Sequence, residues 1–291
     1  MSTVLIKIYN KIKGYGRLVM FSHTIFSLGF ALVSMLLAAN GFPKFSTLFW
    51  ILICFLGART GANAINRVID AEIDARNPRT SNRQVPKGEM KKKEIIIFTA
   101  ICFFIMLFGA YKLNSICLIL SPAALFLMII YSYTKRFTFL CHLVLGVTCA
   151  CAPVGAWLAI TGEISWIPLV MGAANTLWVA GFDIIYGSQD YEFDKSNKLH
   201  SIPVQFGVKN ALRIAMLFHV LTVIFLIALG LLAQELGMIY FIGVFIISIL
   251  LAIQYKIVSP TNLTNVNIAS YSINQLVSLT FLAFGLLDVM F

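Results

Sequence analysis

The chain has 291 residues, of which 59% are hydrophobic and only 12% are charged, and its mean hydropathy is +0.88. A soluble domain usually carries about twice that charged fraction, so the composition excludes an ordinary soluble protein. Hydrophobic runs of about 18 residues or more recur along the whole length and predict a polytopic helical membrane protein. These runs leave no room for a separate soluble domain. We therefore expect one integral membrane domain over residues 1–291, with an all-α fold.

Nine transmembrane helices are predicted from the hydrophobic runs, and a short segment precedes them. Residues 1–16 alternate Leu5, Ile8 and Ile12 with lysines, a pattern typical of an amphipathic helix at the membrane interface. The predicted spans lie near residues 18–39, 47–66, 95–112, 115–134, 139–160, 166–186, 211–233, 237–256 and 266–289. Because the number of spans is odd, the two termini are expected on opposite sides of the membrane.

Basic residues gather in alternate connections between the spans. The N-terminal segment, the 67–94 loop and the 187–210 loop are rich in lysine and arginine, whereas the opposite connections hold few. By the positive-inside rule, the N-terminus and both loops face the cytoplasm and the C-terminus faces outside. Topology and anionic lipid headgroups account for the net charge of +10, so no nucleic-acid partner is expected.

Two short clusters hold seven of the twelve acidic residues of this apolar chain, where a carboxylate is costly. Within each cluster oxygen-bearing side chains recur every four residues, which places them along one stripe of a helix. A further aspartate lies two turns before the second stripe. Oxygen ligands on two facing stripes suit Mg²⁺, which completes its shell with waters and substrate phosphates. The ligands predicted on this basis are Asn66, Asp70, Asp74, Asp183, Asp190 and Asp194.

Cations surround these acids in the sequence, and Lys198 continues the four-residue step of the second cluster. Acids that bind Mg²⁺ beside cations that bind oxyanions indicate a diphosphate site. The simpler interpretation is that acids at helix ends are complemented by the basic loops, but two clusters at one membrane face favour a metal site. The predicted diphosphate-binding residues are Arg67, Arg79, Arg83, Lys135, Arg136 and Lys198.

Deeper in the second span lies Arg59, about 16 Å along the helix axis from the first acidic stripe at 1.5 Å per residue. An arginine at that depth must face a cavity or a partner. It could anchor a carboxylate of a substrate, or it could be held by backbone carbonyls. Asn63, Tyr133, Trp178 and Tyr186 are predicted to line the same cavity, where the aromatic rings would stabilise an allylic cation. Interhelical packing is the alternative for these residues.

Motifs of the form NxxxDxxxD at 66–74 and DxxYxxxDxxxD at 183–194 resemble those of the UbiA superfamily of intramembrane aromatic prenyltransferases. Residues 79–83, 131–138 and 153–157 also resemble that family, so the likeness covers essentially the whole chain. The runs FSHTIFSLGFAL, GFDIIYGSQDYEFD and LHSIPVQFG are similar to bacterial 4-hydroxybenzoate polyprenyltransferases, including proteins of the futalosine route to menaquinone.

The resemblance implies nine helices around a central cavity, Mg²⁺ held by both motifs and a polyprenyl diphosphate donor whose tail extends into the lipid bilayer. Asp70, Asp74, Asp190 and Asp194 would be the catalytic residues. The implied acceptor is an aromatic acid, 4-hydroxybenzoate-like or dihydroxynaphthoate-like, in ubiquinone- or menaquinone-type quinone biosynthesis.

Other functions remain open from the sequence. Haem or a sugar phosphate could be the prenyl acceptor. This chain differs from many relatives at two positions, since Arg67 follows Asn66 and Gln84 follows Arg83. A phosphatidyl-type transferase is disfavoured because such enzymes carry a single Asp-rich motif. From another class, a cation transporter would use the acids to bind a permeating ion.

Overall fold

A computed structural model describes residues 14–16, 18–19 and 24–290 of the chain. Within these residues the fold is helical, with one isolated β-bridge and no strand. The interfacial helix predicted over 1–16 lies almost entirely outside the described residues. The helices of the first half are α2 (Thr24–Ala39), α3 (Phe45–Ile69), α4 (Ala71–Arg76), α5 (Lys92–Leu113) and α6 (Ser115–Thr134).

The second half repeats the pattern of long helices interrupted by a short one after the second acidic cluster. A π-helix, η3, leads directly into the last long helix. These elements are α7 (Cys141–Thr161), α8 (Trp166–Gly187), η2 (Ser188–Asp190), α9 (Tyr191–Ser196), α10 (Ile202–Leu232), α11 (Met238–Ile257), η3 (Ile268–Ser272) and α12 (Ile273–Met290).

Eight described helical segments are long and apolar enough to cross a membrane, and they contain α3, α5, α6, α7, α8, α10, α11 and α12. The apolar helix α2 is shorter, with 16 residues or about 24 Å of length. In chain order, these eight segments and α2 correspond to the nine predicted spans. The predicted class, a polytopic all-α membrane protein of about nine helices, is confirmed.

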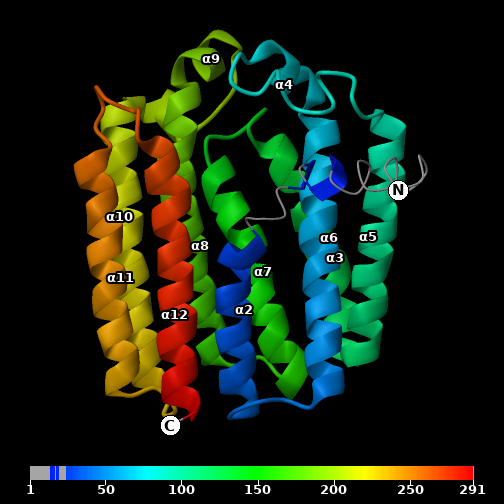
Figure 1. Ribbon diagram of the computed structural model, residues 1–291, viewed down its shortest axis with the longest axis vertical. Helices are drawn as coiled ribbons and strands as arrows, with labels where there is room; N and C mark the ends of the chain where they lie inside the picture. The colour runs from blue at the N-terminus through cyan, green and yellow to red at the C-terminus, as the bar shows by residue number, and fades with distance from the viewer. Residues whose placement is uncertain (1–13, 17, 20–23, 291) are drawn as a thin grey trace, which may run out of the picture.

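The long helices pack into two groups that share α7 (Figure 1). In one group α2, α7, α8, α10, α11 and α12 follow one another around a closed circuit of contacts, since α12 returns to α2. In the other group α3, α5 and α6 pack together and against α7. The short helices α4 and α9 lie at the same end of the bundle, and the C-terminus lies at the opposite end. Both acidic clusters are thereby brought to one end of the molecule.

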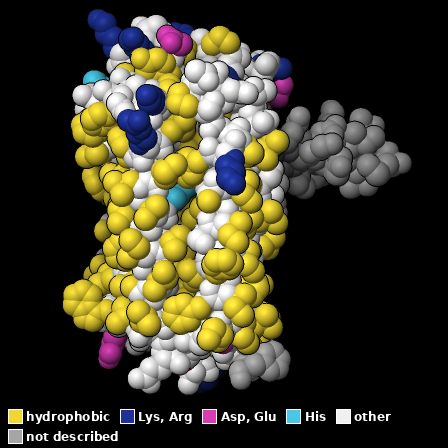
Figure 2. Space-filling model, turned by 90° about the vertical axis from the view of Figure 1, so that its left-hand side faces the viewer, with side chains coloured by type: hydrophobic (Ala, Val, Ile, Leu, Met, Phe, Trp, Pro, Cys, Tyr) yellow, Lys and Arg dark blue, Asp and Glu magenta, His cyan; other side chains and the backbone are white. Residues whose placement is uncertain are grey.

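The outer surface of the bundle is strongly apolar. Large side chains such as Phe104, Phe126 and Phe245 are each more than 60% exposed. Figure 2 shows hydrophobic side chains covering most of one face, with Lys and Arg mainly in its upper part. Exposed apolar surface of this extent is what a lipid-facing surface requires, and the protein is therefore a multi-pass membrane protein.

A layer of stacked aromatic rings forms the core of the closed circuit. Phe30 of α2 stacks on Trp178 of α8, with ring centroids 5.2 Å apart, and on Phe281 of α12 at 4.2 Å. Trp178 is 1% exposed, and its indole N–H donates to Asn274 Oδ1 at 2.7 Å. The prediction that Trp178 lines the cavity is therefore wrong. Its ring packs between helices, and its polar atom is satisfied there.

Each acidic cluster coincides with a break in helical geometry at its aspartate. Asp70 separates α3 from α4 with φ −90° and ψ 3°, and Asp190 separates η2 from α9 with φ −93° and ψ 5°. A six-residue helix follows in both cases. The likeness of the two breaks supports an internal repeat, and it shows that neither stripe lies on one uninterrupted helix.

The second loop also ends differently from the prediction. Lys198 lies beyond the end of α9, is exposed and has a left-handed φ of 56°. It therefore does not continue the stripe formed by Asp190 and Asp194, and that part of the prediction is wrong. The next span, predicted to begin at 211, begins at Ile202 and is broken at Gly207, whose φ of 76° favours glycine.

Helix α7 offers a direct test of the packing. A Cβ atom added at Gly146 would lie 2.3 Å from the backbone oxygen of Thr176 in α8, whereas one added at Gly155 would meet nothing within 4 Å. We expect Gly146→Ala to lower the free energy of unfolding by about 1–3 kcal/mol, because the two backbones would have to separate. Thermal unfolding of the purified protein in detergent measures the change. Gly155→Ala in the same helix is the matched control, and equal stability of both variants would contradict the predicted contact.

Candidate active site

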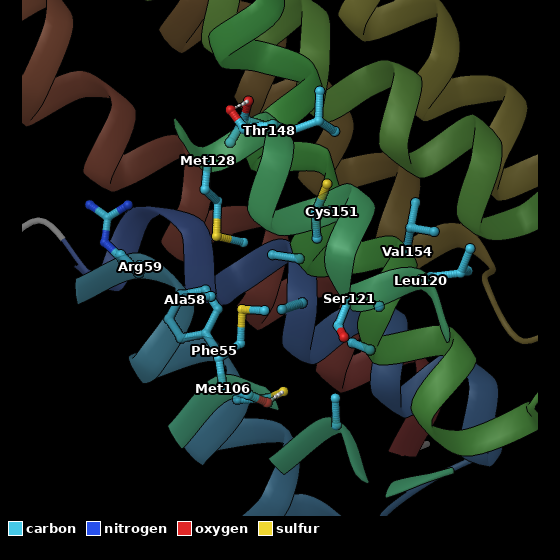
Figure 3. Close-up of a pocket in the computed structure, with 18 of the residues that line it drawn as sticks. Phe55, Ala58, Arg59, Met106, Leu120, Ser121, Met128, Thr148, Cys151 and Val154 are labelled. Carbon is cyan, nitrogen blue, oxygen red and sulfur yellow. Dashed lines mark hydrogen bonds between the residues drawn. The ribbon is translucent and has the colours of Figure 1, made fainter. Parts of the chain in front are cut away.

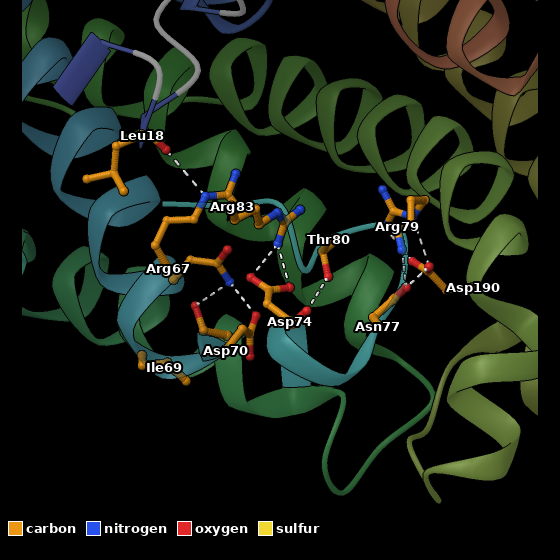
Figure 4. A network of polar contacts seen from close by, with 12 residues as sticks. Leu18, Arg67, Ile69, Asp70, Asp74, Asn77, Arg79, Thr80, Arg83 and Asp190 are labelled. Carbon is orange, nitrogen blue, oxygen red and sulfur yellow. Dashed lines mark hydrogen bonds and ion pairs between the residues drawn. The ribbon is translucent and has the colours of Figure 1, made fainter. Parts of the chain in front are cut away.

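The first acidic cluster is fixed by an arginine from its own loop (Figure 4). Both carboxylate oxygens of Asp74 accept hydrogen bonds from Arg83 Nη1 at 2.7 Å, and the Asp74 side chain is buried. The hydroxyl of Thr80 donates to the backbone oxygen of Asp74 at 3.1 Å. The loop after α4 is therefore folded back over the cluster. This arrangement places a predicted diphosphate-binding arginine directly on a predicted metal ligand.

Asp70 lies at the break between α3 and α4 and is more exposed than Asp74. Asn66 Nδ2 donates to Asp70 Oδ2 at 2.7 Å, and Arg136 Nη2 lies 3.5 Å from Asp70 Oδ1. Burial and then the neighbouring Asp74 carboxylate raise the pKa of Asp70 above its ordinary value, although Arg136 opposes the shift. A site that raises the pKa of a carboxyl group in this way favours additional positive charge.

The second cluster is joined to the first by the loop that follows α4. Arg79 forms a bidentate pair with Asp190, with Nε to Oδ1 at 2.9 Å and Nη2 to Oδ2 at 2.5 Å. Asn77 Nδ2 donates to the same Oδ1 at 2.9 Å, and Asn77 Oδ1 accepts the backbone N–H of Arg79. Burial lowers the pKa of Arg79, but the hydrogen bonds to Asp190 outweigh it and raise the pKa overall. Arg79 thus remains a cation at the junction of the two motifs.

Asp194 is the most deeply buried acid of the site. Lys135 Nζ lies 2.8 Å from Asp194 Oδ2, and the carboxylate side chain is 1% exposed. Oδ1 has no hydrogen-bond partner among the described residues. Burial lowers the pKa of Lys135, but the Asp194 carboxylate raises it overall. A buried carboxylate oxygen without a donor is costly, which marks it as a position for a ligand.

A metal ion would fit this site by donor chemistry. Within the described part of the chain, no group of three His, Cys, Asp or Glu side chains lies close enough to enclose an ion. Asp70, Asp74, Asp190 and Asp194 are each held by a cationic side chain instead. Their oxygens are nevertheless the hard ligands that Mg²⁺ prefers, and the unpartnered Asp194 oxygen is one of them.

A cavity of about 360 Å³ opens among α2, α3, α5, α6 and α7 (Figure 3). Its walls are mainly apolar, and Arg59 and Asn63 of α3 line it as predicted. Tyr131 of α6 also lines it and donates through its hydroxyl to the backbone oxygen of Ala62 at 3.2 Å. The cavity therefore lies between the helices of the first half and α7, with a cationic group in a mainly apolar wall.

Several predicted site residues lie elsewhere. Tyr133 is on the outer surface, with the guanidinium carbon of Arg136 5.1 Å from its ring centroid, and it does not line the described cavity. Arg67 is buried, and its Nε donates to the backbone oxygen of Leu18 at 3.3 Å. This hydrogen bond joins α3 to the chain at Leu18. In both cases the helix rotation turns the side chain away from the position expected from spacing alone.

Asp183 has a partner that the sequence did not suggest. Its Oδ2 lies 2.7 Å from Nδ1 of His142 in α7. His142 is buried, and its Nε2 has no hydrogen-bond partner among the described residues. Asp183 is therefore paired with the neighbouring helix α7, whereas loop or helix-end cations hold the other acids, and its role as a metal ligand stays a prediction. The short connection over 162–165 predicts that α7 and α8 are neighbours, but no local pattern indicates which of their side chains meet.

Tyr186 does not line the described cavity as predicted, and it lies instead against Arg79 beside the second acidic motif. The guanidinium carbon of Arg79 lies 4.7 Å from the Tyr186 ring centroid, and Arg79 Nη1 donates to the Tyr186 hydroxyl. Residues missed by the sequence reasoning include Asn77, Tyr131 and His142. Tyr131 had a usable signal, since Leu127, Met128 and Tyr131 follow helical spacing along α6 and all line the cavity.

The comparison with known proteins agrees with this architecture. The family model described as UbiA prenyltransferase family matches residues 27–279. The chain belongs to the UbiA prenyltransferase family. It is therefore an enzyme that transfers prenyl groups, and the resemblance seen in its motifs is confirmed.

Curated relatives in the UbiA family match most of the chain. The 4-hydroxybenzoate octaprenyltransferase of Francisella tularensis subsp. novicida is 31% identical over 252 residues, which is 85% of this chain and 86% of that protein. The 4-hydroxybenzoate octaprenyltransferase of Vibrio campbellii is 29% identical over 225 residues, or 77% of this chain and 78% of that protein.

Solved UbiA structures share the fold. An apo UbiA homolog from Aeropyrum pernix K1 has a TM-score of 0.83 at 31% identity, covering 93% of this chain and 98% of that one. A UbiA homolog from Archaeoglobus fulgidus, bound to GPP and Mg²⁺, has a TM-score of 0.71 at 20% identity, covering 96% and 100%. At that lower identity the likeness shows the fold alone.

Asn77 provides a test of the junction between the two motifs. We expect Asn77→Ala to lower kcat/KM for the prenyl diphosphate by about tenfold, because a hydrogen bond to the Asp190 carboxylate and the anchor of the Arg79 backbone are both lost. Steady-state prenyl transfer by the purified enzyme measures the effect. Asn82→Ala changes an exposed residue of the same loop and serves as the control. Equal activity of the two variants would show that the junction has no role in catalysis.

Proposed function

We propose that this enzyme transfers a polyprenyl group from polyprenyl diphosphate to an aromatic acid, in a Mg²⁺-dependent reaction of quinone biosynthesis. The observation that carries the proposal is the junction of the two acidic motifs through Arg79 and Asn77, at one end of a bundle that encloses an apolar cavity with Arg59 in its wall. The 4-hydroxybenzoate octaprenyltransferase relatives support the aromatic acid, and the homolog bound to GPP and Mg²⁺ supports the donor and the metal.

The charges of the site are suited to binding Mg²⁺ and a diphosphate together. Four carboxylates stand opposite four cations, which pair as Arg83 with Asp74, Arg79 with Asp190, Lys135 with Asp194 and Arg136 with Asp70. Asn66, Asp70, Asp74, Asp190 and Asp194 would hold Mg²⁺, leaving the four cations for the diphosphate oxygens. Bound Mg²⁺ would supply positive charge that stabilises the departing diphosphate.

Transfer begins when the allylic carbon–oxygen bond breaks and its electron pair stays with the diphosphate. Arg79, Arg83 and Lys135 stabilise the negative charge that grows there. This stabilisation lowers the barrier, because the additional charge is present in the transition state and not in the ground state. The allylic cation is then attacked by a ring carbon of the acceptor, and the ring loses the proton at that carbon. Tyr186, whose ring already stacks on a guanidinium, offers a π-face to the cation.

Arg59 is the residue we assign to the acceptor. It lies in an apolar wall, where a guanidinium attracts a carboxylate more strongly than it does in water. An aromatic acid bound by Arg59 would have its ring in the apolar part of the cavity. The ring would then be held in a water-poor space, which protects the allylic cation from hydrolysis.

The topology completes the proposal. Basic residues surround α4 and α9 at the end of the bundle that holds both motifs, and the C-terminus lies at the other end (Figure 1). By the positive-inside rule, the active-site loops 67–94 and 187–210 and the N-terminus are cytoplasmic, and the C-terminus lies outside. Water-soluble aromatic acids would then reach the site from the cytoplasm, while the prenyl tail remains in the bilayer.

The donor half of the reaction is tested with labelled polyprenyl diphosphate, a panel of aromatic acids and product identification by mass. We expect Asp190→Ala to reduce turnover by about two orders of magnitude or more, because the second motif then loses a ligand and the partner of Arg79. Glu192→Ala removes an exposed acid of the same cluster and is the matched control. Chelation with EDTA should abolish turnover and Mg²⁺ should restore it. Near wild-type turnover of Asp190→Ala would refute the proposal.

The acceptor half is tested at Arg59. We expect Arg59→Ala to raise KM for the aromatic acid by about tenfold or more while KM for the prenyl diphosphate changes little, because the lost contact is a charge-assisted pair. Arg59→Lys, which keeps the charge, should retain part of the affinity. The analogous phenol without a carboxylate should be used equally poorly by wild type and by Arg59→Ala. A large effect of Arg59→Ala on that phenol would assign Arg59 a structural role instead.

A further inference from the structure

The last transmembrane helix begins with an unusually wide turn. Ile268–Ser272 form the π-helix η3, which continues into α12. A π turn inserts one residue relative to an α-helix and rotates the preceding side chains, and such turns occur frequently at functional sites. Ser270 Oγ donates to the backbone oxygen of Phe182 in α8 at 3.3 Å. The wide turn is therefore attached to the helix that leads into the second acidic motif.

The buried side-chain amide of Asn274 stabilises this π turn. Asn274 Nδ2 donates to the backbone oxygens of Ala269 at 3.0 Å and Ser270 at 3.2 Å, both within η3. Asn274 Oδ1 accepts from Trp178 Nε1 at 2.7 Å and from Gln254 Nε2 at 3.1 Å. All four hydrogen-bonding positions of this side chain are used, and it is 1% exposed. Residues of α8, α11 and α12 thus fix the geometry of the turn together.

The turn presents Tyr271 to the active site. Its ring packs edge-on against that of Tyr186, with centroids 5.2 Å apart and planes at 67°. Tyr186 in turn carries Arg79 on its ring face and at its hydroxyl, and Arg79 pairs with Asp190. A continuous series of contacts therefore runs from the wide turn to the carboxylate of the second motif.

We propose that Tyr271 is a positioning residue of the diphosphate site. Held by the π turn, its ring fixes the ring of Tyr186, and Tyr186 fixes the guanidinium of Arg79 in the direction that the diphosphate requires. An arginine side chain loses several rotatable bonds on binding, so a preorganised guanidinium binds an oxyanion more tightly than a mobile one. The proposal rests on the proposed function for the identity of the ligand.

The experiment compares binding and catalysis in purified protein. Affinity for an unreactive thio-analogue of farnesyl diphosphate is measured with Mg²⁺, beside kcat and KM for prenyl transfer. We expect Tyr271→Leu, which removes the aromatic ring, to weaken analogue binding and to raise KM for the prenyl diphosphate by about three- to tenfold, the effect of one lost ring–ring contact. The KM for the aromatic acid should stay within about twofold, since the contacts of Tyr271 lead to Arg79 and not to Arg59.

Two further variants separate positioning from stability. Asn274→Ala leaves the tyrosine intact but removes the amide that holds the turn, and it should reproduce the Tyr271→Leu effect on the prenyl diphosphate. Tyr240→Leu is the matched control, because it also removes one tyrosine ring, which packs against the ring of Phe281 with centroids 6.2 Å apart, far from the motifs in sequence and in contacts. It should leave KM for both substrates unchanged.

A double-mutant cycle decides the route of the effect. If Tyr271 acts through Arg79, adding Tyr271→Leu to Arg79→Lys should change analogue affinity by less than about twofold. The same fold-change in both backgrounds, or wild-type affinity of Tyr271→Leu, would overturn the inference. If wild type binds the analogue but prenylates no aromatic acid, the proposed function fails, and the binding comparison still decides the role of Tyr271.

Discussion

The structure depends on the pairing of buried carboxylates with cations at one end of an apolar bundle. A carboxylate that is removed from water must be compensated, and breaking a buried pair leaves an uncompensated charge that destabilises the fold. Here the cation that compensates an acid comes from a distant part of the chain. Arg79, from the loop after the first motif, forms a bidentate pair with Asp190 of the second, 111 residues away in sequence. Lys135, at the end of α6, pairs with Asp194. These pairs hold the ends of α3, α6 and α8 together and so build the site.

The same pairs would allow the fold to accept the ligands proposed above. A divalent cation and a diphosphate carry opposite charges, so together they could replace internal ion pairs while limiting the net charge left in the apolar interior. The cavity below is lined mainly by apolar side chains, with Arg59 as a charged group in its wall. Charge is thus concentrated at one end, where bond breaking would occur, and the remaining volume is suited to rings and isoprenoid chains. A cation transporter would need acids distributed along the bundle, whereas both clusters lie at the same end.

Much of the fold and of the site was predictable, because hydrophobic runs and the spacing of the acids are visible directly in the sequence. Hydropathy gave the spans to within a few residues for most helices, and the four-residue step of the acids indicated that Asp70 and Asp74, or Asp190 and Asp194, would act together. The errors arose where a short-range rule was extended too far. Lys198 follows the same step but lies past the end of α9, and Trp178 and Tyr133 are polar-edged aromatic residues whose direction depends on helix rotation. Rotation is decided by neighbouring helices, such as the close approach of Gly146 to Thr176, and no local pattern records it.

By itself the sequence determined the membrane class, the number and order of the helices, the two acidic motifs and the family, because apolar length, helical period and motif spacing are local properties of the chain. Only the tertiary structure decided which charges meet. It paired Arg79 with Asp190, and Asp183 with His142. It also placed Arg67 against the backbone of Leu18, and Tyr271 against Tyr186. Each of these contacts joins residues that are far apart in sequence, or depends on a break in helical geometry. The energy of burying a charge or an amide selects such partners only once the helices have packed.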